Sequence, residues 1–447
     1  MLWGCMDKSM LKSKLFYYLL LLSLLVLAAV FVFNTRTNER GTRNEAAQSP
    51  PPAPGRPDQI SILIENSYLP YMRQIAARYE EQYGIKVEIR STDINSLHDQ
   101  IEDSILRGGT DLDLIQVDTV WTTEFARTGL LEPLRNYVSG SVIDKLVPIA
   151  YNQRVISNDL YALPDLYAFP VLMEEKFLYY NETMLKSAGI YAPPATWEEL
   201  KDMAKYIQDK GLAKYGLIWS WKPGEGLITD YTLLANALGV QAKDANGRWV
   251  FNEGGGVQAL EFMVNTLRSS GLSDPASLTA GEMSAIETFA EGKLPFLISW
   301  AYADPILSRK PGFKMALVPG FEGYQRSSTV TGGGALGITR TSRHKDWAWK
   351  FIDLTISLRN EVSAKDQIGG LSVWNEQVDQ FENEEKYLNR NLMTEQFEYA
   401  INRPSMSSYV EWSNVLQDAI TSALTGKKTA RQALDEAKAE IEKQGIK

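Results

Sequence analysis

Strand-like and helix-like segments alternate along this chain from about residue 59 onward. Residues 60–65 form an apolar strand pattern, and 66–70 interrupt it. Tyr71, Ile75 and Tyr79 then recur at helical spacing, and Gly84 ends the helix. Residues 85–90 alternate as a second strand. A helical crossover between two strands implies parallel pairing with a right-handed connection, so the sequence predicts an α/β sheet.

The same alternation continues to the C-terminus. Residues 112–117 predict a third strand, and later strands are expected at 176–180, 215–221, 294–300 and 313–318. Three capping boxes predict helix starts, at Thr196–Glu199, Thr279–Glu282 and Thr429–Gln432. Because a chain of 447 residues exceeds what one hydrophobic core usually holds, we expect two α/β lobes.

The amino-acid composition argues against several classes of function. The net charge is −9 and no basic block stands out, so we expect no nucleic-acid partner. The chain has one cysteine, Cys5, and two histidines, His98 and His344. It therefore has no pair for a disulfide and little for a zinc site or a histidine-dependent hydrolase. We predict no metal and no cofactor, and the absence of nucleotide-binding and hydrolase motifs predicts that the protein is not an enzyme.

The N-terminus reads as a membrane segment. Lys8, Lys12 and Lys14 precede an apolar run at 15–33 that is long enough to cross a bilayer. No A-x-A site follows it, and a lipoprotein would need a cysteine after the run, whereas Cys5 precedes it. We interpret the run as an uncleaved single-pass anchor helix, with a cleaved signal peptide as the alternative. The Pro-rich segment 34–57 predicts a disordered linker that holds the folded body away from the membrane.

Tryptophans gather at the predicted strand ends. Trp121, Trp219, Trp221 and Trp300 lie at or just after the ends of strands, where open α/β sheets bind ligands. A flat ring there can stack on the apolar face of a sugar while polar neighbours take its hydroxyls. For any one of them, packing in the core is the competing interpretation.

Carboxylates also fall at strand ends, at Glu65, Asp118 and Asp304. Each could accept hydrogen bonds from adjacent sugar hydroxyls, and Asp118 could equally cap the helix that follows it. A glycosidase carboxylate pair stays open, because the sequence gives no separation between the carboxylates. The triple glycine 332–334 precedes a strand, which indicates either a flexible start of that strand, a hinge or a close approach to a ligand.

The order of these segments resembles family 1 extracellular solute-binding proteins, the sugar and oligosaccharide receptors of ABC importers related to maltose-binding protein. Each motif alone is weak, but together they cover residues 59–447 in the family's order. The matching segments are 111–118 with 129–134, then 160–164, 177–181 and 194–200, 289–293 leading to Trp300, 331–338, and 403–404 through 433–434.

The resemblance implies an α/β, two-lobed periplasmic-binding-protein-like fold of the Venus-flytrap type II, here with an N-terminal anchor helix. We expect five parts: a cytoplasmic N-terminus at 1–14, the anchor or signal segment at 15–33, the linker at 34–57, lobe 1 at 58–172 plus 337–376, and lobe 2 at 173–336 plus 377–447.

The resemblance also implies which residues lie near the ligand. It suggests Glu65, Asn66, Asp118, Tyr167, Trp219, Trp221, Trp300 and Tyr302, with Gly333 lining a crossover between the lobes and Trp374 as a further candidate. Trp121 and Asp304 join this set from their strand-end positions alone.

These observations predict an extracytoplasmic binding protein that captures a carbohydrate, by expectation an oligosaccharide, and delivers it to the permease subunits of an ABC importer. We expect a monomer on the outer side of the cell membrane. The alternatives are an extracellular carbohydrate-active enzyme and a surface receptor that reports ligand to a sensor protein.

Overall fold

The first sheet of the computed structural model has five strands in the order β2-β1-β3-β12-β6. Their bounds are β1 Gln59–Glu65, β2 Lys86–Thr92, β3 Leu114–Asp118, β6 Phe169–Pro170 and β12 Gly334–Ile338. The structure describes residues 55–106, 111–157, 164–379 and 388–446. The apolar run 15–33, the N-terminus before it and nearly all of the linker lie outside these residues. Within them, no helix has the length and apolar character needed to cross a bilayer.

The predicted strand–helix–strand unit is confirmed. Helix α2 (Leu69–Tyr83) connects β1 to β2, and the two strands pair in parallel from Gln59↔Lys86 to Glu65↔Thr92. Tyr71, Ile75 and Tyr79 are buried, as their spacing predicts, and the helix ends at Gly84 with a left-handed φ of 63°.

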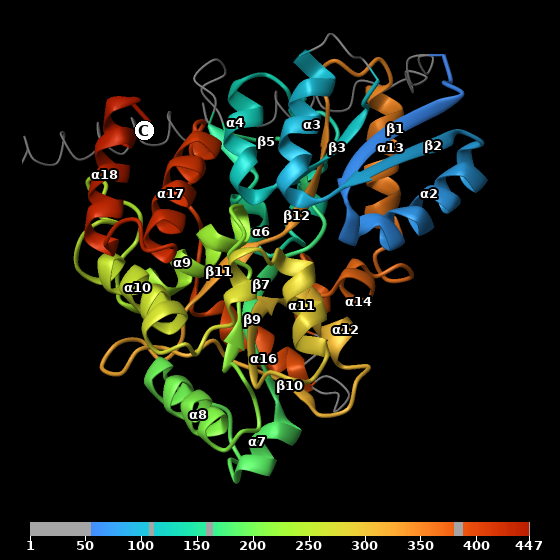
Figure 1. Ribbon diagram of the computed structural model, residues 1–447. Helices are drawn as coiled ribbons and strands as arrows, with labels where there is room; N and C mark the ends of the chain where they lie inside the picture. Colours follow the sequence, from blue (N-terminus) through green and yellow to red (C-terminus); the bar gives the residue numbers. More distant parts are fainter. Residues whose placement is uncertain (1–54, 107–110, 158–163, 380–387, 447) are drawn as a thin grey trace, which may run out of the picture. The chain divides into compact units, whose positions relative to one another are not determined.

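A strand from much later in the chain completes this sheet. β12 runs antiparallel to β3, with all five of its residues paired from Gly334↔Asp118 to Ile338↔Leu114. The boundary predicted between residues 336 and 337 therefore falls inside β12. Helices α2 and α13 (Lys345–Ser357) pack together beside this sheet, and α3 (Ile94–Leu106) packs on β1 (Figure 1).

The second sheet has the order β13-β11-β7-β9-β8, with β10 also paired to β7. Its strands are β7 Glu174–Asn181, β8 Leu217–Ile218, β9 Phe296–Trp300, β10 Phe313–Ala316, β11 Thr329–Gly332 and β13 Ala400–Ile401. A separate pair joins β4 (Val155–Ser157) to β5 (Pro164–Leu166). The strand expected at 215–221 is thus only two residues long.

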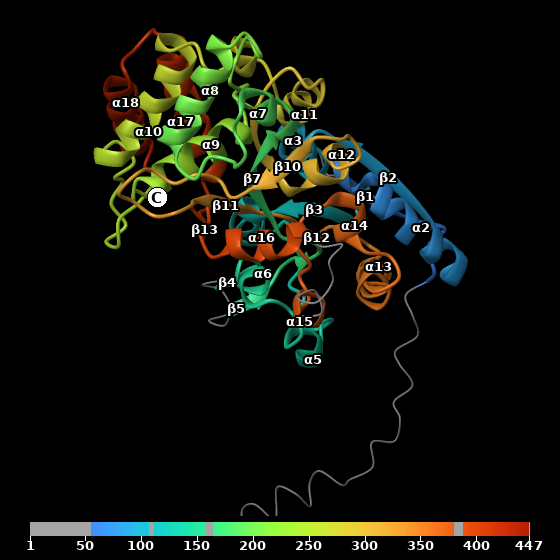
Figure 2. The same cartoon turned by 90° about the horizontal axis from the view of Figure 1, so that it is seen from below.

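Helices cover the second sheet and its flanks (Figure 2). In Figure 1, α17 and α18 stand together beside α9 and α10. The remaining helices are α4 Thr122–Arg127, α5 Gly140–Ile143, α6 Pro148–Asn152, α7 Glu182–Ala188, α8 Trp197–Asp209, α9 Glu225–Ala237, α10 Gly254–Val264, α11 Glu282–Ala290, α12 Asp304–Leu307, α14 Ala364–Ile368, α15 Asn375–Asp379, α16 Leu388–Phe397, α17 Tyr409–Leu424 and α18 Ala430–Lys443.

Two of the three predicted capping boxes correspond to helix starts. Thr196 caps α8 by accepting from Glu199 N, and Thr429 with Gln432 forms a complete capping box at α18. The box predicted at Thr279 is wrong, because Thr279 ends the short 3-10 helix Pro275–Leu278 and Gly281 precedes α11. Glu282 is thereby left available for another role.

The chain crosses between the two sheets at short connections. It passes from β6 to β7 through residues 171–173 and returns from β11 to β12, where Gly333 alone separates the strands. Met173 pairs with Leu371 beside the first connection, through backbone hydrogen bonds of 3.1 and 2.8 Å. These connections bring the ends of β1, β3 and β9 toward the same region.

Candidate ligand-binding site

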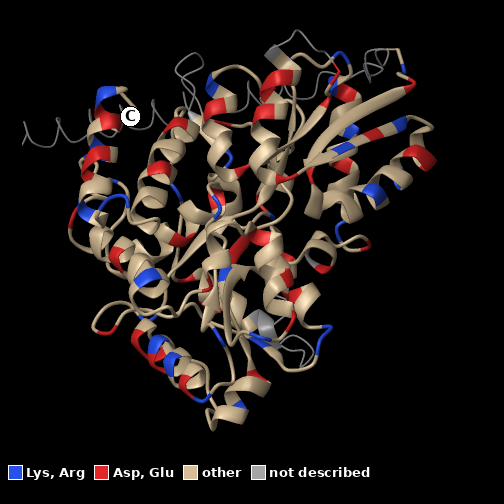
Figure 3. Ribbon diagram, in the orientation of Figure 1, with Lys and Arg blue, Asp and Glu red and all other residues tan. Residues whose placement is uncertain are grey.

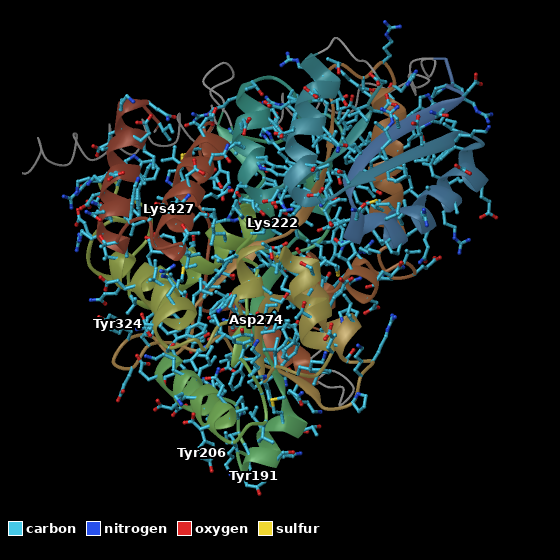
Figure 4. The ribbon with its side chains drawn as sticks, viewed as in Figure 1. Tyr191, Tyr206, Lys222, Asp274, Tyr324 and Lys427 are labelled. Atoms are coloured by element: carbon cyan, nitrogen blue, oxygen red, sulfur yellow. The ribbon has the colours of Figure 1, made fainter. Side chains whose placement is uncertain are left out.

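A cavity in two connected parts lies between the sheets. The inner part, of about 60 Å³, is lined by side chains from both sheets, and the outer part has a volume of about 390 Å³. Both parts share Glu65, Ser67, Ile94, Glu282 and Tyr302, so they form one continuous site. Lys222, which is labelled in Figure 4, is among the residues that line the outer part.

The triple glycine makes room for two aromatic rings of the inner part. A Cβ atom on Gly332 would lie 2.8 Å from the Trp300 ring, and one on Gly334 would lie 2.6 Å from the Tyr68 hydroxyl. Gly333 has a φ of 125°, and a Cβ there would meet the Leu172 carbonyl oxygen at 2.2 Å. Glycine is therefore required at this connection both for backbone conformation and for space.

Trp300 ends β9 and is held rigidly at the cavity. Its indole N–H donates to Glu282 Oε1 at 2.6 Å, and the Tyr302 hydroxyl donates to Glu282 Oε2 at 3.1 Å. The Lys176 ammonium lies 5.3 Å from the centre of the indole ring. One carboxylate at the start of α11 thus fixes two aromatic side chains on the cavity wall.

Glu65 and Asp118 end two neighbouring parallel strands and both face the inner part. Each also begins a 3-10 turn: Glu65 accepts from Ser67 N at 2.9 Å, and Asp118 accepts from Val120 N at 3.1 Å. Burial raises the pKa of Glu65 to about 7, against the lowering effect of the Ser67 hydrogen bonds. The predicted cap at Asp118 is confirmed, and the same residue lines the cavity, whereas its contact with a ligand stays a prediction.

Glu174 begins β7 and is the most deeply buried carboxylate on the inner wall. Only 9% of its surface is exposed, and its Oε1 atom has no hydrogen-bond partner. Burial raises its pKa well above the usual range, and the negative charges of Glu65, Glu282 and Asp118 raise it further.

Two buried arginines lie at this end of the cavity: Arg403 lines the inner part, and Arg154 does not. Arg403 donates to Glu225 Oε2 at 2.5 Å and to Asp118 Oδ1 at 3.1 Å, and so links α9 to the end of β3. Arg154 donates from Nη2 to the Gly333 carbonyl oxygen at 2.6 Å and from Nη1 to the Val117 carbonyl oxygen at 3.0 Å. Arg403 therefore neutralises carboxylates, whereas Arg154 supports the backbone of the connection.

The structure brings together five of the residues predicted for the site. Glu65, Asp118, Trp300, Tyr302 and Gly333 line the inner part of the cavity. Their contact with a ligand stays a prediction.

The other predicted residues lie elsewhere, and the reasons are physical. Trp219 and Trp221 are fully buried and stack on each other at 5.0 Å. Trp121 is buried against His98 at 5.3 Å between ring centres. These three indoles pack in the core rather than on the cavity wall.

The remaining four predicted residues also do not line the cavity. Tyr167 is buried in the core, and Trp374 lines a separate hollow beside Phe169. Asn66 is exposed, and Asp304 begins α12. None of these residues is among those that line the cavity.

Sequence reasoning missed several polar residues of the site. The chief ones are Glu174, Glu225, Glu282 and Arg403. Glu174 had a signal, since Glu174-Glu175-Lys176 places three charges directly before an apolar strand segment. Glu282 was instead assigned to a capping box. Figure 3 shows acidic positions close to the N-terminal end of α11.

Known proteins with this architecture include sugar-bound ones. Maltose-bound MalE3 of Thermotoga maritima superimposes with a TM-score of 0.78 at 25% identity, over 86% of this chain and 99% of that one. An ABC substrate-binding protein of Listeria monocytogenes in complex with cycloalternan has a TM-score of 0.75 at 19% identity, over 87% of this chain and 99% of that one. These comparisons show the two-lobed, MalE-like α/β fold.

Sequence comparison finds binding proteins as well. A binding protein of Brucella abortus is 25% identical over 291 residues, which are 64% of this chain and 68% of the relative. A mannitol-binding protein of Pseudomonas aeruginosa is 26% identical over 296 residues, which are 64% of this chain and 66% of the relative. The family model described as bacterial extracellular solute-binding protein matches residues 65–357, so the chain belongs to that family.

Proposed function

We propose that the cavity between the two sheets captures a polyhydroxylated ligand, a sugar or sugar alcohol, which the protein delivers to an ABC importer. The observation that carries the proposal is Trp300, whose indole lies on the inner wall with its N–H already bound to Glu282. We propose that the ring stacks on the apolar face of a pyranose.

Hydrogen-bonding groups surround that ring. Glu65 and Gln116 line the cavity from the first sheet and Ser67 from the turn after β1, while Glu174 lines it from β7 and Glu282 from the start of α11. A closed site of this kind offers acceptors to ligand hydroxyls from both sides. Micromolar affinity needs about 8 kcal/mol, which a stacked ring with several hydrogen bonds can supply. The proteins bound to maltose and cycloalternan, together with the mannitol-binding relative, support this ligand class.

The two parts of the cavity support a proposal about the size of the ligand. The outer part is larger than the inner part, and the two are continuous through Glu65 and Tyr302. We propose that one sugar ring occupies the inner part and that a second unit extends into the outer part, which favours an oligosaccharide.

The experiment is a titration of the full chain with neutral monosaccharides, oligosaccharides and sugar alcohols, followed by tryptophan fluorescence and calorimetry. We expect saturable binding of at least one class. Trp300→Ala should weaken it by ten- to a hundredfold, because a stacked aromatic contact contributes roughly 1–3 kcal/mol. The matched control is Trp349→Ala on α13, which removes an indole that does not line the cavity. No saturable binding across the panel would refute the proposal.

We further propose that the protein binds its ligand without changing it. The family consists of binding proteins, which supports this view. Chromatography of each bound oligosaccharide after long incubation with the full chain should return it unaltered. Release of shorter products, abolished by a Glu282→Gln change, would favour the alternative of a carbohydrate-active enzyme.

The membrane anchor at 15–33, the linker at 34–57, the monomeric state and the lobe boundaries belong to the same proposal. They rest on the apolar run, on the Pro-rich segment and on the resemblance described above. Membrane fractionation of cells that express the full chain tests the anchor: we expect the protein in the membrane fraction, and its release at native length into the medium would contradict it.

A further inference from the structure

The inner part of the cavity is strongly acidic. Its wall carries five carboxylates, from Glu65, Asp118, Glu174, Glu225 and Glu282, and one cationic side chain, that of Arg403. We propose that the ligand carries a protonated amine, as an amino sugar or amino polyol does, and that its ammonium group binds among Glu65, Glu174 and Glu282. This inference rests on the proposed function and narrows the ligand class of the same site.

The first step is to ask which carboxylates already have a cationic partner. Arg403 contacts Asp118 and Glu225, and Glu225 also accepts from the Tyr409 and Ser413 hydroxyls at 2.6 Å each. These two carboxylates are therefore satisfied within the protein.

The other three have no such partner among the described residues. Glu65 accepts only from Ser67, and Glu282 accepts from Trp300 and Tyr302, all neutral donors. The fully buried Lys176, on β7 with Glu174, donates to Asp230 at 2.6 Å.

Glu174 is the independent sign that a ligand group belongs here. It is nine-tenths buried, it lines the inner part, and its Oε1 atom has no hydrogen-bond partner. An unpaired buried carboxylate is costly, because burial removes its water without replacing the lost hydrogen bonds. A donor supplied by the ligand would remove that cost.

A charged donor fits better than a hydroxyl. An ammonium group offers three donors and a positive charge, whereas a hydroxyl offers one donor and no charge. Burial together with the neighbouring carboxylates raises the pKa of Glu65 and of Glu174, which shows how unfavourable their negative charges are in these surroundings. An ammonium ion reverses this effect through charge-assisted hydrogen bonds.

The aromatic side chains of the inner part also favour an ammonium group. Tyr68, Trp300 and Tyr302 line the inner part next to these carboxylates. The faces of aromatic rings attract cations, and proteins commonly bind ammonium groups between such rings and acidic side chains. The alternative is that Glu65 and Glu174 are protonated and donate hydrogen bonds to a neutral sugar, and the experiment separates the two.

The experiment compares matched ligands on the full chain at pH 7. Calorimetry and tryptophan fluorescence would measure glucose against glucosamine and N-acetylglucosamine, and cellobiose against the disaccharide of glucosamine and its diacetylated form. We expect the free-amine member of a series to bind at least about tenfold more tightly than its neutral and acetylated counterparts. The acetylated forms keep the nitrogen but remove the charge.

Two variants locate the effect. Glu174→Gln preserves shape and should reduce the preference for the amine by about tenfold or more, and Glu282→Gln provides a second test if Glu174→Gln folds poorly. The matched control is Glu261→Gln on an exposed position of α10, which should keep the preference. Thermal melting of each variant checks that it is folded.

Each result has a distinct meaning. Equal or tighter binding of the neutral sugars would overturn this inference and leave the proposed function intact. An amine preference that survives in Glu174→Gln and Glu282→Gln would overturn the assignment of these carboxylates. Binding of putrescine without binding of any sugar would overturn the proposed function, and no binding by any ligand would overturn both.

Discussion

The guanidinium of Arg403 lies 3.1 Å from the carboxylate of Asp118, at the point where β3 of the first sheet ends. The same guanidinium contacts Glu225 at the start of α9. Only 2% of the Arg403 side chain is exposed. Arg403 is therefore a buried link between β3 and α9, which lie on opposite sides of the cavity.

Replacing Arg403 with leucine should therefore destabilise the protein strongly. We expect a loss of about 3–5 kcal/mol in the free energy of unfolding, because two carboxylates lose their cation while partly buried. Chemical denaturation of the full chain measures it. The control is Arg326→Leu, whose exposed pair with Glu395 should contribute less than about 1 kcal/mol. Similar losses in the two variants would contradict the role given to Arg403.

Gly333→Ala should destabilise the protein more than Gly323→Ala. Both glycines have positive φ, 125° and 81°, so both substitutions strain the backbone by about 1–2 kcal/mol. Only at Gly333 does the new Cβ also meet another atom, the Leu172 carbonyl oxygen at 2.2 Å, whereas nothing lies within 4 Å at Gly323. Thermal melting compares the two variants, and equal shifts would show that the β11–β12 connection accommodates a side chain.

The fully buried pair of Lys176 and Asp230 should show non-additive stability effects. Lys176→Met alone leaves a buried carboxylate and should cost about 3–5 kcal/mol, and Asp230→Leu alone should cost a similar amount. The double variant should cost much less than the sum, because no unpaired charge remains. Denaturation of the three variants forms a double-mutant cycle, and strict additivity would argue against a direct pair.

Glu65 should make stability depend on pH. Its pKa is about 7 in the folded protein, above its ordinary value of 4.5, so the unfolded state releases this proton first as pH rises. The favourable contribution of Glu65 to the free energy of unfolding is fully present below about pH 4.5. It is lost as pH rises through about 7. Between pH 5 and pH 8, wild type should lose about 2 kcal/mol relative to Glu65→Gln. Burial is the main cause of this raised pKa; the Ser67 hydrogen bonds lower it, and the negative charges of Glu282 and Asp93 raise it further.

Denaturation of wild type, Glu65→Gln and the control Glu261→Gln at both pH values measures this difference. Glu261→Gln should follow wild type at both values, since Glu261 lies exposed on α10. A constant difference between wild type and Glu65→Gln would show that the Glu65 pKa is not raised.

Local sequence patterns predict the structure best where it depends on neighbouring residues. The β1–α2–β2 unit could be predicted because periodicity and a stopping glycine are properties of neighbouring residues. Glu65 and Asp118 could be predicted at the cavity because the ends of parallel strands meet at one edge of a sheet. Both predictions use only a short stretch of chain and one rule of sheet geometry.

The rest of the site depends on long-range contacts. Arg403 meets Asp118 across 285 residues, and Glu282 meets Trp300 from a helix start that looked like part of a cap. Trp219 and Trp221 show the opposite error: β8 spans only two residues, so these indoles follow no strand alternation and stack in the core. No local pattern distinguishes an indole at a cavity from one packed in the core.

The hydrogen bonds around the β11–β12 connection determine where a pivot between the halves can lie. Arg154 donates to the Gly333 carbonyl oxygen, and the Gly334 amide donates to the Tyr68 hydroxyl at 2.8 Å. Both partners belong to the chain around the first sheet, so Gly333 and Gly334 are clamped to that sheet. Gly332 is paired with Glu174 in the second sheet, so when the protein releases its ligand the torsional change should fall on the link between Gly332 and Gly333.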